Sequence, residues 1–210
     1  MLEFINFKKY YYNTLSLDIP TFIIRPGIHL LKGSNGSGKT TLLRSLAGLL
    51  KFEGDIKLNE ISLKESPLVQ RKLINYSEAD PKFPPFLTGT DFIKLFALLK
   101  QSSAEKTGAI MERLKIGAYA NNPIGTYSSG MLKKLSVTLA FIGTPAIILL
   151  DEPFANLDTD SVMPIYELIR DLHMKSNITF IITNHQDFVF DFIKFDSQML
   201  LQDNNLKLVE

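Results

Sequence analysis

The 210-residue sequence contains no cysteine and no tryptophan, and its charges nearly cancel, leaving a formal net charge of +1. Without cysteine the chain forms neither disulfides nor a thiolate metal site, which is consistent with a reducing compartment. A net charge this small gives no reason to expect direct binding of nucleic acid. The basic pairs Lys8-Lys9 and Lys133-Lys134 are interpreted as solvated faces.

Long hydrophobic runs and a leader sequence are also lacking. No apolar run approaches the roughly 20 residues that span a bilayer. Residues 1–9 (MLEFINFKK) do not have the basic-then-apolar order of a signal peptide. A hydrophobic content of 45% with 21% charged residues is ordinary for a globular domain with a full core. We therefore expect a soluble protein in which any membrane role depends on a partner.

Hydrophobic periodicity predicts an α/β fold in one domain of residues 1–210. The prediction comprises a mainly parallel core (1–78 and 142–210), an antiparallel β subdomain at the N-terminus, and an inserted helical subdomain (79–141). The expected strands are 2–7, 15–19, a hairpin over 54–63 turning at 59–60, the buried runs 146–150 and 179–183, and a hairpin over 198–208 turning at 203–205. The expected helices lie between 88 and 142 and over 161–174.

Residues 33–40 read GSNGSGKT, the pattern of a phosphate-binding loop. Its glycines adopt backbone conformations that other residues resist, so that N–H groups can converge on a phosphate. An apolar run precedes the loop and leucines at helical spacing follow it, which places a helix N-terminus at the phosphates. The predicted nucleotide-binding residues here are Gly33, Ser34, Asn35, Gly36, Ser37, Gly38, Lys39, Thr40 and Thr41. Lys39 supplies a charge for the phosphates, and the Thr40 hydroxyl is a predicted Mg²⁺ ligand. A Gly/Ser-rich surface turn is the structural alternative.

Two carboxylates, Asp151 and Glu152, follow the apolar run 146–150. In phosphate-loop enzymes the aspartate after such a strand holds Mg²⁺. Because side chains alternate along a strand, we expect Glu152 to point the other way, toward a water that it activates as general base. The structural alternative is a helix cap followed by a proline turn. His185 lies just past the next predicted strand, which places it near the γ-phosphate.

Residues 127–131 (YSSGM), upstream of the carboxylates, resemble the signature motif Leu-Ser-Gly-Gly-Gln of ATP-binding-cassette (ABC) ATPases. The order of features along nearly the whole chain is also similar to that family. The resemblance implies a Walker A loop at 33–40, a Q-loop position at Glu78, a signature at Ser128, Ser129 and Gly130, a Walker B segment at 147–152, a D-loop aspartate at Asp158 and a switch histidine at His185. It also implies an aromatic that stacks on adenine; Tyr10, Tyr11 and Tyr12 are the candidates, and we select Tyr11.

In this family the signature contacts the ATP held by the other protomer, so the resemblance implies a head-to-tail dimer that ATP closes and hydrolysis opens. Ser128 offers a hydroxyl, and Ser129 and Gly130 offer helix N-terminal N–H groups. The sequence departs from the family at three positions. Ser129 replaces glycine, Met131 replaces glutamine, and Glu78 stands where the family has glutamine. An ionised glutamate cannot donate a hydrogen bond, so Glu78 would hold either a water or Mg²⁺.

The resemblance implies an ATP-hydrolysing subunit of an ABC transporter, exporter-like, with ATP and Mg²⁺ as cofactors. Its partners would be a second ABC ATPase, as homodimer or heterodimer, and an integral membrane subunit that docks near the aromatic-proline segment 83–87. It would be cytoplasmic, at the inner face of the membrane. Phe83 and Phe86 have a structural alternative, pinning the helical subdomain to the core. The functional alternatives are a soluble ABC ATPase of translation or DNA maintenance, a small-molecule kinase, and an ATP-gated subunit that scarcely hydrolyses.

Overall fold

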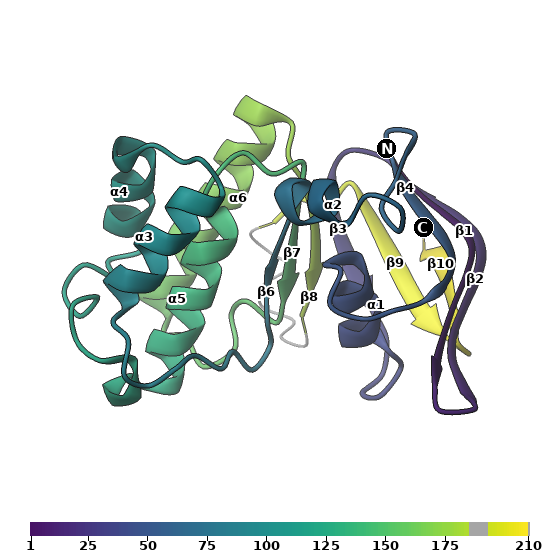
Figure 1. Cartoon of the computed structure of the whole chain (residues 1–210), viewed down its shortest axis with the longest axis horizontal. Helices are drawn as coiled ribbons and strands as arrows, with labels where there is room; N and C mark the ends of the chain where they lie inside the picture. The colour runs from purple at the N-terminus through teal and green to yellow at the C-terminus, as the bar shows by residue number, and fades with distance from the viewer. Residues whose placement is uncertain (185–192, 210) are drawn as a thin grey trace.

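The computed structural model describes residues 1–184 and 193–209, and over these residues it is an α/β fold built around two sheets (Figure 1). The first sheet is antiparallel with strand order β2-β1-β4-β5, and the second has the order β10-β9-β3-β8-β7-β6. In the second sheet the pairs β9–β3, β3–β8, β8–β7 and β7–β6 are parallel, and only the β10–β9 pair is antiparallel. The predicted fold class is therefore confirmed.

The elements of the described chain have the following bounds. The strands are β1 (Leu2–Tyr11), β2 (Thr14–Ile24), β3 (Ile28–Lys32), β4 (Glu53–Leu58), β5 (Ile61–Ser62), β6 (Ile74–Ser77), β7 (Ile147–Asp151), β8 (Thr179–Thr183), β9 (Ser197–Gln202) and β10 (Asn205–Val209). The helices are α1 (Lys39–Leu46), α2 (Pro67–Leu73), α3 (Gly89–Leu99), α4 (Ala104–Arg113), α5 (Ser129–Phe141) and α6 (Thr159–Ser176), with a 3₁₀ turn, η1, at Ile124–Thr126.

The parallel sheet is buried on both faces. Along β7, Ile147 and Leu149 join a hydrophobic cluster with α1 and the antiparallel sheet, whereas Ile148 and Leu150 join a second cluster with α5 and α6. Figure 1 shows the same layers, with α1 between the two sheets and α3, α4, α5 and α6 on the far side of the parallel sheet. A strand with helices on both faces needs a continuous apolar run, which explains why β7 has no alternating pattern.

The carboxyl ends of β7 and β8 lie side by side. Their parallel register pairs Asp151 with Thr183, and β3, which leads into the phosphate loop, pairs with β8 on its other side. Residues that follow these strands therefore share one edge of the sheet. This topology brings the loop at 33–38 and the carboxylates at 151–152 together although more than 100 residues separate them in sequence.

Side-chain caps set where α3, α5 and α6 begin. Thr88 accepts a hydrogen bond from the Asp91 amide at the start of α3, and Ser128 does the same for Met131 at the start of α5. The carboxylate of Asp158 accepts from the Ser161 amide at 2.8 Å, so α6 begins at Thr159, two residues earlier than the hydrophobic pattern predicts.

Both predicted hairpins are present. The β4–β5 turn has Asn59 and Glu60 in the left-handed region, at φ 48° and 69°, as a two-residue turn that joins antiparallel strands requires. The β9–β10 turn uses Asp203 and Asn204 in the same region, at φ 50° and 63°, and Asn205 already belongs to β10.

In the described part of the chain no helix combines the length and apolarity needed to cross a membrane.

Candidate functional site

The loop between β3 and α1 is shaped by glycine. Gly36 has φ 79° and Gly38 has φ 104°, both in the left-handed region. A Cβ on Gly38 would also lie 2.8 Å from Leu17 Cδ2, so the loop is packed against the antiparallel sheet. The Oγ of Ser37 is buried and has no hydrogen-bond partner among the described residues. A buried, unsatisfied hydroxyl in a glycine-rich loop that opens a helix fits an anionic ligand.

Lys39 opens α1 and is 7% exposed. Its Nζ donates to the carbonyls of Gly33 at 2.8 Å and Ser34 at 3.0 Å, which folds the side chain back along its own loop. Burial lowers the pKa of Lys39, and the carboxylates of Glu152 and Asp151 act in the opposite direction. The loop thus presents a cation whose counter-charges belong to the strand-end carboxylates.

The Asp151 carboxylate is 1% exposed and gathers hydroxyl donors from neighbouring elements. Thr40 donates to its Oδ2 at 2.8 Å and Tyr76 to the same oxygen at 3.2 Å, while Thr183 donates to Oδ1 at 2.6 Å. The two predicted metal ligands, Thr40 and Asp151, are therefore in direct contact. Burial, followed by the charge of Asp151, raises the pKa of Tyr76, which keeps this hydroxyl protonated as a donor.

A hydroxyl and a carboxylate are hard oxygen ligands of the kind that Mg²⁺ prefers. Mg²⁺ in phosphate-loop sites takes few protein ligands and the phosphates of the nucleotide. The Thr40–Asp151 pair, adjacent to the Lys39 loop, has the donor set for this ion.

Glu152 follows β7 but does not continue it. The strand ends at Asp151, and Glu152 has φ 48°, in the left-handed region that a residue with a side chain occupies only at a cost. Its amide donates to Thr183 Oγ1 at 2.9 Å. Glu152 therefore lies outside the strand, so alternation along β7 does not apply to it, and its expected direction toward a water stays a prediction. His185, the predicted switch histidine, lies outside the described residues.

Tyr11, the selected adenine-stacking candidate, contacts the helix that follows the phosphate loop. Its Oη lies 3.3 Å from Thr41 Oγ1, at the start of α1. The Nζ of Lys9 lies 4.9 Å from the centre of the Tyr11 ring. Tyr12, by contrast, is fully exposed in the β1–β2 turn, with φ 52°.

The predicted signature residues form the first turn of α5. Ser128 Oγ accepts from the Met131 amide at 3.2 Å, and the Ser128 amide in turn donates to Met131 Sδ at 3.5 Å. A Cβ on Gly130 would lie 2.7 Å from the Asn156 carbonyl oxygen, so the helix start and the segment before Asp158 are in close contact. The hydrogen bond from Ser161 is the main cause that lowers the pKa of Asp158, which caps α6.

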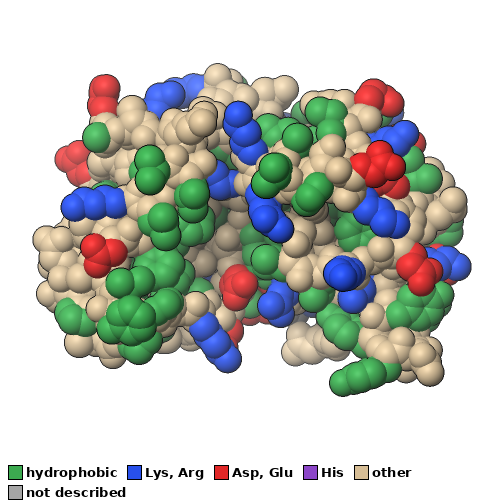
Figure 2. Space-filling model, in the orientation of Figure 1, with side chains coloured by type: hydrophobic (Ala, Val, Ile, Leu, Met, Phe, Trp, Pro, Cys, Tyr) green, Lys and Arg blue, Asp and Glu red, His purple; other side chains and the backbone are tan. Residues whose placement is uncertain are grey.

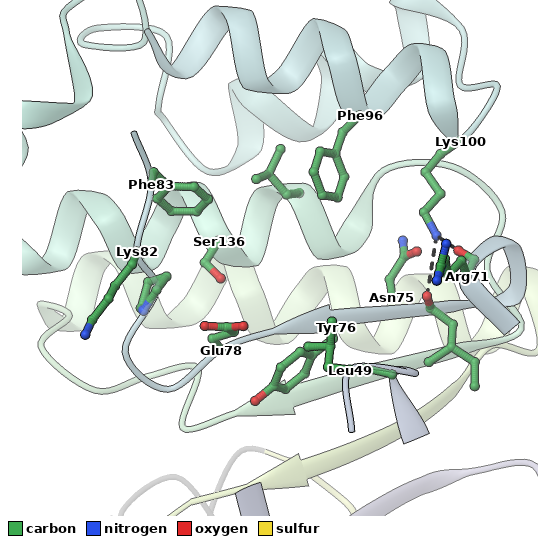
Figure 3. Close-up of a pocket in the computed structure, with 14 residues that line it drawn as sticks. Leu49, Arg71, Asn75, Tyr76, Glu78, Lys82, Phe83, Phe96, Lys100 and Ser136 are labelled. Atoms are coloured by element: carbon green, nitrogen blue, oxygen red, sulfur yellow. Dashed lines mark hydrogen bonds between the residues drawn. The ribbon is translucent and has the colours of Figure 1, made fainter. Parts of the chain in front are cut away.

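Glu78 follows β6 and lines a groove of about 330 Å³ (Figure 3). The close-up places Phe83 and Phe96 on the helical side of this groove and Tyr76 and Leu49 on the sheet side. Phe83 packs edge-on against Phe92 of α3, with ring centres 5.2 Å apart. Figure 2 shows this face of the molecule hollowed between helices and sheets, with Lys, Arg and hydrophobic side chains at the border.

Sequence reasoning missed three residues of the site. Tyr76 is the next-to-last residue of β6 and Thr183 is the last of β8, and these strands lie on either side of β7, a position that signals contact with Asp151 once the strand order is known. The third is Lys133, for which the expectation of a solvated face is wrong, because the side chain is 1% exposed. Its ammonium donates to backbone carbonyls of Glu78, Ala79 and Asp151.

Comparison with known proteins identifies the family. The sequence model of the ABC transporter family matches residues 17–155 of this chain. An uncharacterized ABC transporter ATP-binding protein of Bacillus subtilis, YxlF, is 36% identical over 155 residues, covering 71% of this chain and 51% of that protein. ATP-binding cassette sub-family A member 2 of Homo sapiens is 34% identical over 178 residues, covering 81% of this chain and 7% of that protein. The chain thus spans about half, or much less, of the curated relatives that it matches.

Solved structures show the same fold. An ATP-binding subunit of an ABC transporter superposes with a TM-score of 0.88 at 23% identity, covering 99% of this chain and 88% of that one. A dimeric bacterial ABC transporter cassette superposes with a TM-score of 0.84, also at 23% identity, covering 99% of this chain and 97% of that one. The chain belongs to the ABC transporter family, in the class of its ATP-binding cassette ATPases.

Proposed function

We propose that this protein is the ATP-binding and ATP-hydrolysing subunit that powers an ABC transporter. The observation that carries the proposal is the 2.8 Å contact between the Thr40 hydroxyl and the Asp151 carboxylate, beside the ammonium of Lys39. This arrangement joins the phosphate loop to the end of β7 and provides an anion cradle and hard oxygen ligands in one place.

In the proposed mechanism the loop amides of residues 33–38 and the Lys39 ammonium bind the phosphates of ATP. Thr40 and Asp151 would hold Mg²⁺, which when bound neutralises charge on the phosphate oxygens. Glu152 would take the proton of the attacking water as general base. His185 would assist at the γ-phosphate, and Tyr11 would stack on adenine. Glu78 would hold a water or contribute to the metal site.

Hydrolysis is proposed to occur in a head-to-tail dimer, with either a second copy or another ABC ATPase. Ser129 and Gly130 are the first residues of α5, where helix geometry leaves N–H groups without intrahelical acceptors, which suits the γ-phosphate of a nucleotide on the partner. ATP would then join the two protomers, and its hydrolysis would release them. The segment at Asp158 would lie at the same interface, because it contacts the start of α5.

A membrane subunit is proposed to dock at the groove beside Glu78, and the protein would thereby lie at the cytoplasmic face of the membrane. The side chain of Phe86, three residues after the groove-lining Phe83, is 78% exposed, whereas Phe83 is half-buried against Phe92. Phe83 therefore packs within the helical part, residues 79–141, and Phe86 is an aromatic side chain available to a partner. An exposed apolar side chain beside a groove is a common feature of protein interfaces.

The test of the proposal is the Glu152→Gln variant, which keeps the shape of the side chain but not its basicity. We expect ATP binding to be retained and turnover to fall by about 10²–10⁴, the usual cost of losing a general base. ATP should also trap this variant as a dimer, which size-exclusion chromatography with Mg-ATP would detect.

Two results would contradict the proposal. The first is wild-type turnover in Glu152→Gln, which would show that Glu152 is not the general base. Purification of the trapped variant from native membranes in mild detergent, followed by mass spectrometry, addresses the transport role. A polytopic membrane protein is the expected partner, and ribosomal or DNA-repair proteins in its place would exclude transport.

A further inference from the structure

Lys133 lies in the second turn of α5, yet its side chain is among the most buried in the described residues. Its Nζ donates to the carbonyl of Glu78 at 2.8 Å, to that of Ala79, and to that of Asp151 at 3.4 Å. The first two carbonyls follow β6 and the third ends β7. One ammonium group therefore joins α5 to the two strand ends that carry Glu78 and the strand-end carboxylates.

The peptide group between Asp151 and Glu152 is held on both sides. Its carbonyl accepts from Lys133 Nζ at 3.4 Å, and its N–H donates to Thr183 Oγ1 at 2.9 Å. This is the peptide that leads into the left-handed backbone of Glu152, at φ 48°. Such a conformation persists where surrounding contacts over-determine it. Lys133 and Thr183 are two of these contacts.

The charge of Lys133 is costly to bury and is balanced locally. Burial lowers its pKa, while Asp151, Glu152, Asp80 and Glu78 act in the opposite direction. An apolar side chain in this position would avoid the cost of desolvating an ammonium group, but it would leave three carbonyls without this donor. Burial of the lysine thus lowers stability, but its hydrogen bonds hold the backbone around the carboxylates in one arrangement.

We propose that Lys133 is a positioning residue for ATP hydrolysis, which fixes the Asp151–Glu152 peptide and the Glu78 segment to α5. The inference rests on the proposed function, because it assumes that Glu152 is the general base. Lys133 does not touch the nucleotide in this proposal. It orients the Glu152 side chain by holding the backbone before it, and it couples the signature turn at Ser128 to the end of β7.

The experiment compares Lys133→Met, which removes the ammonium group at similar length, with Lys133→Arg, which keeps a charged donor. Lys94→Met, an exposed lysine of α3, is the matched control. With Mg-ATP we expect Lys133→Met to lower kcat by about 10–100-fold, the scale of a small misplacement of a catalytic group. KM for ATP should change by less than about threefold. Arginine should restore most of kcat, and Lys94→Met should match the wild type.

A double-mutant cycle with Glu152→Gln tests the route of the effect. If Lys133 acts through Glu152, Lys133→Met should lower the single-turnover rate much less in the Glu152→Gln background than in the wild type. An equal fold-loss in both backgrounds, or wild-type kcat in folded Lys133→Met, would overturn the inference. Should Lys133→Met not fold, Lys133→Gln replaces it in the same cycle under the same criteria.

The two proposals fail separately. Normal turnover in Lys133→Met together with slow turnover in Glu152→Gln overturns the positioning role and leaves the proposed function intact. Normal turnover in Glu152→Gln overturns the proposed function, and the role of Lys133 falls with it. A loss that appears as a raised KM with unchanged kcat would also contradict positioning, since it would indicate a binding defect.

Discussion

The buried carboxylate of Asp151 receives hydroxyl donors from three different elements. Thr40 comes from α1, Tyr76 from β6 and Thr183 from β8. Hydrogen bonds to an ionised acceptor are stronger than neutral ones, so these contacts hold both the charge and the orientation of the side chain. Two of the three donors are bound to one oxygen, Oδ2. Asp151 is therefore preorganised by its neighbours before any ligand is considered.

Tyr11 is the residue on which the adenine prediction can be tested. Replacing it with alanine removes a ring that lies beside Thr41, and base–aromatic stacking contributes about 1–3 kcal/mol. We expect Tyr11→Ala to weaken ATP binding by about tenfold, measured by titration with a fluorescent ATP analogue.

Two variants control this prediction. Tyr11→Phe keeps the ring and loses only the hydroxyl, so its affinity should stay close to that of the wild type. Tyr12→Ala removes a fully exposed side chain and should bind ATP normally. A large loss of affinity in Tyr12→Ala with none in Tyr11→Ala would assign the stacking residue differently.

At the scale of elements, two helical glycines differ in what surrounds them. Gly108 lies within α4 with no atom within 4 Å of its missing Cβ, whereas a Cβ on Gly130 in α5 would lie 2.7 Å from the Asn156 carbonyl. Alanine favours a helix over glycine by about 0.8–1.0 kcal/mol. The same substitution should therefore have opposite effects in the two helices.

We expect Gly108→Ala to raise Tm by about 2–4 °C, as an added 1 kcal/mol does in a protein of this size. Gly130→Ala should lower Tm, because either α5 or the segment at Asn156 has to move. It should also weaken ATP-driven dimerisation of the Glu152→Gln protein, measured by size-exclusion chromatography. An increase of Tm in both variants would show that the backbone at Asn156 can move to accommodate a Cβ at position 130 at little cost in stability.

At the scale of the whole molecule, Lys100 gives the stability a predictable dependence on pH. Its Nζ donates to backbone carbonyls of Arg71 and Ile74, and burial lowers the pKa of Lys100 to about 8, from 10.5. Between these two values the unfolded chain holds the proton and the folded chain does not. The free energy of unfolding contributed by this group therefore rises with pH from about 8 to 10.5 and is lowest below pH 8.

The measurement is urea unfolding at several pH values for the wild type and for Lys100→Met. The difference in unfolding free energy between the two proteins should shift in favour of the wild type as the pH increases from 8 to 10.5. A difference that is constant over this range would show that the pKa of Lys100 is the same in the folded and unfolded chain.

Several structural features of this protein depend on short segments of the chain and can be predicted from the sequence. The run 147–150 is apolar over successive residues because helices cover both faces of β7, and this pattern does not depend on the identity of those helices. The phosphate loop is equally local, since its glycines and its lysine work through the backbone of the same segment. The hairpin turn at Asn59-Glu60 follows from two residues in the left-handed region.

What the tertiary structure decided depends on contacts between distant segments. Lys133 and Lys134 are adjacent lysines in one helix, and nothing in that pair indicates which side chain is buried. Only the packing of α5 against the ends of β6 and β7 places the ammonium of Lys133 among three carbonyls, so its burial cannot be read from helical spacing.

The same reason applies to Glu152. Its sequence position, directly after a buried strand, identifies a carboxylate at the edge of the sheet, but its left-handed backbone depends on hydrogen bonds to Thr183 and to Lys133. The fold class, the phosphate loop and the carboxylates after β7 could be predicted from the sequence alone. The direction of the side chains there was decided by three-dimensional packing, because the partners that hold them come from other strands and from α5.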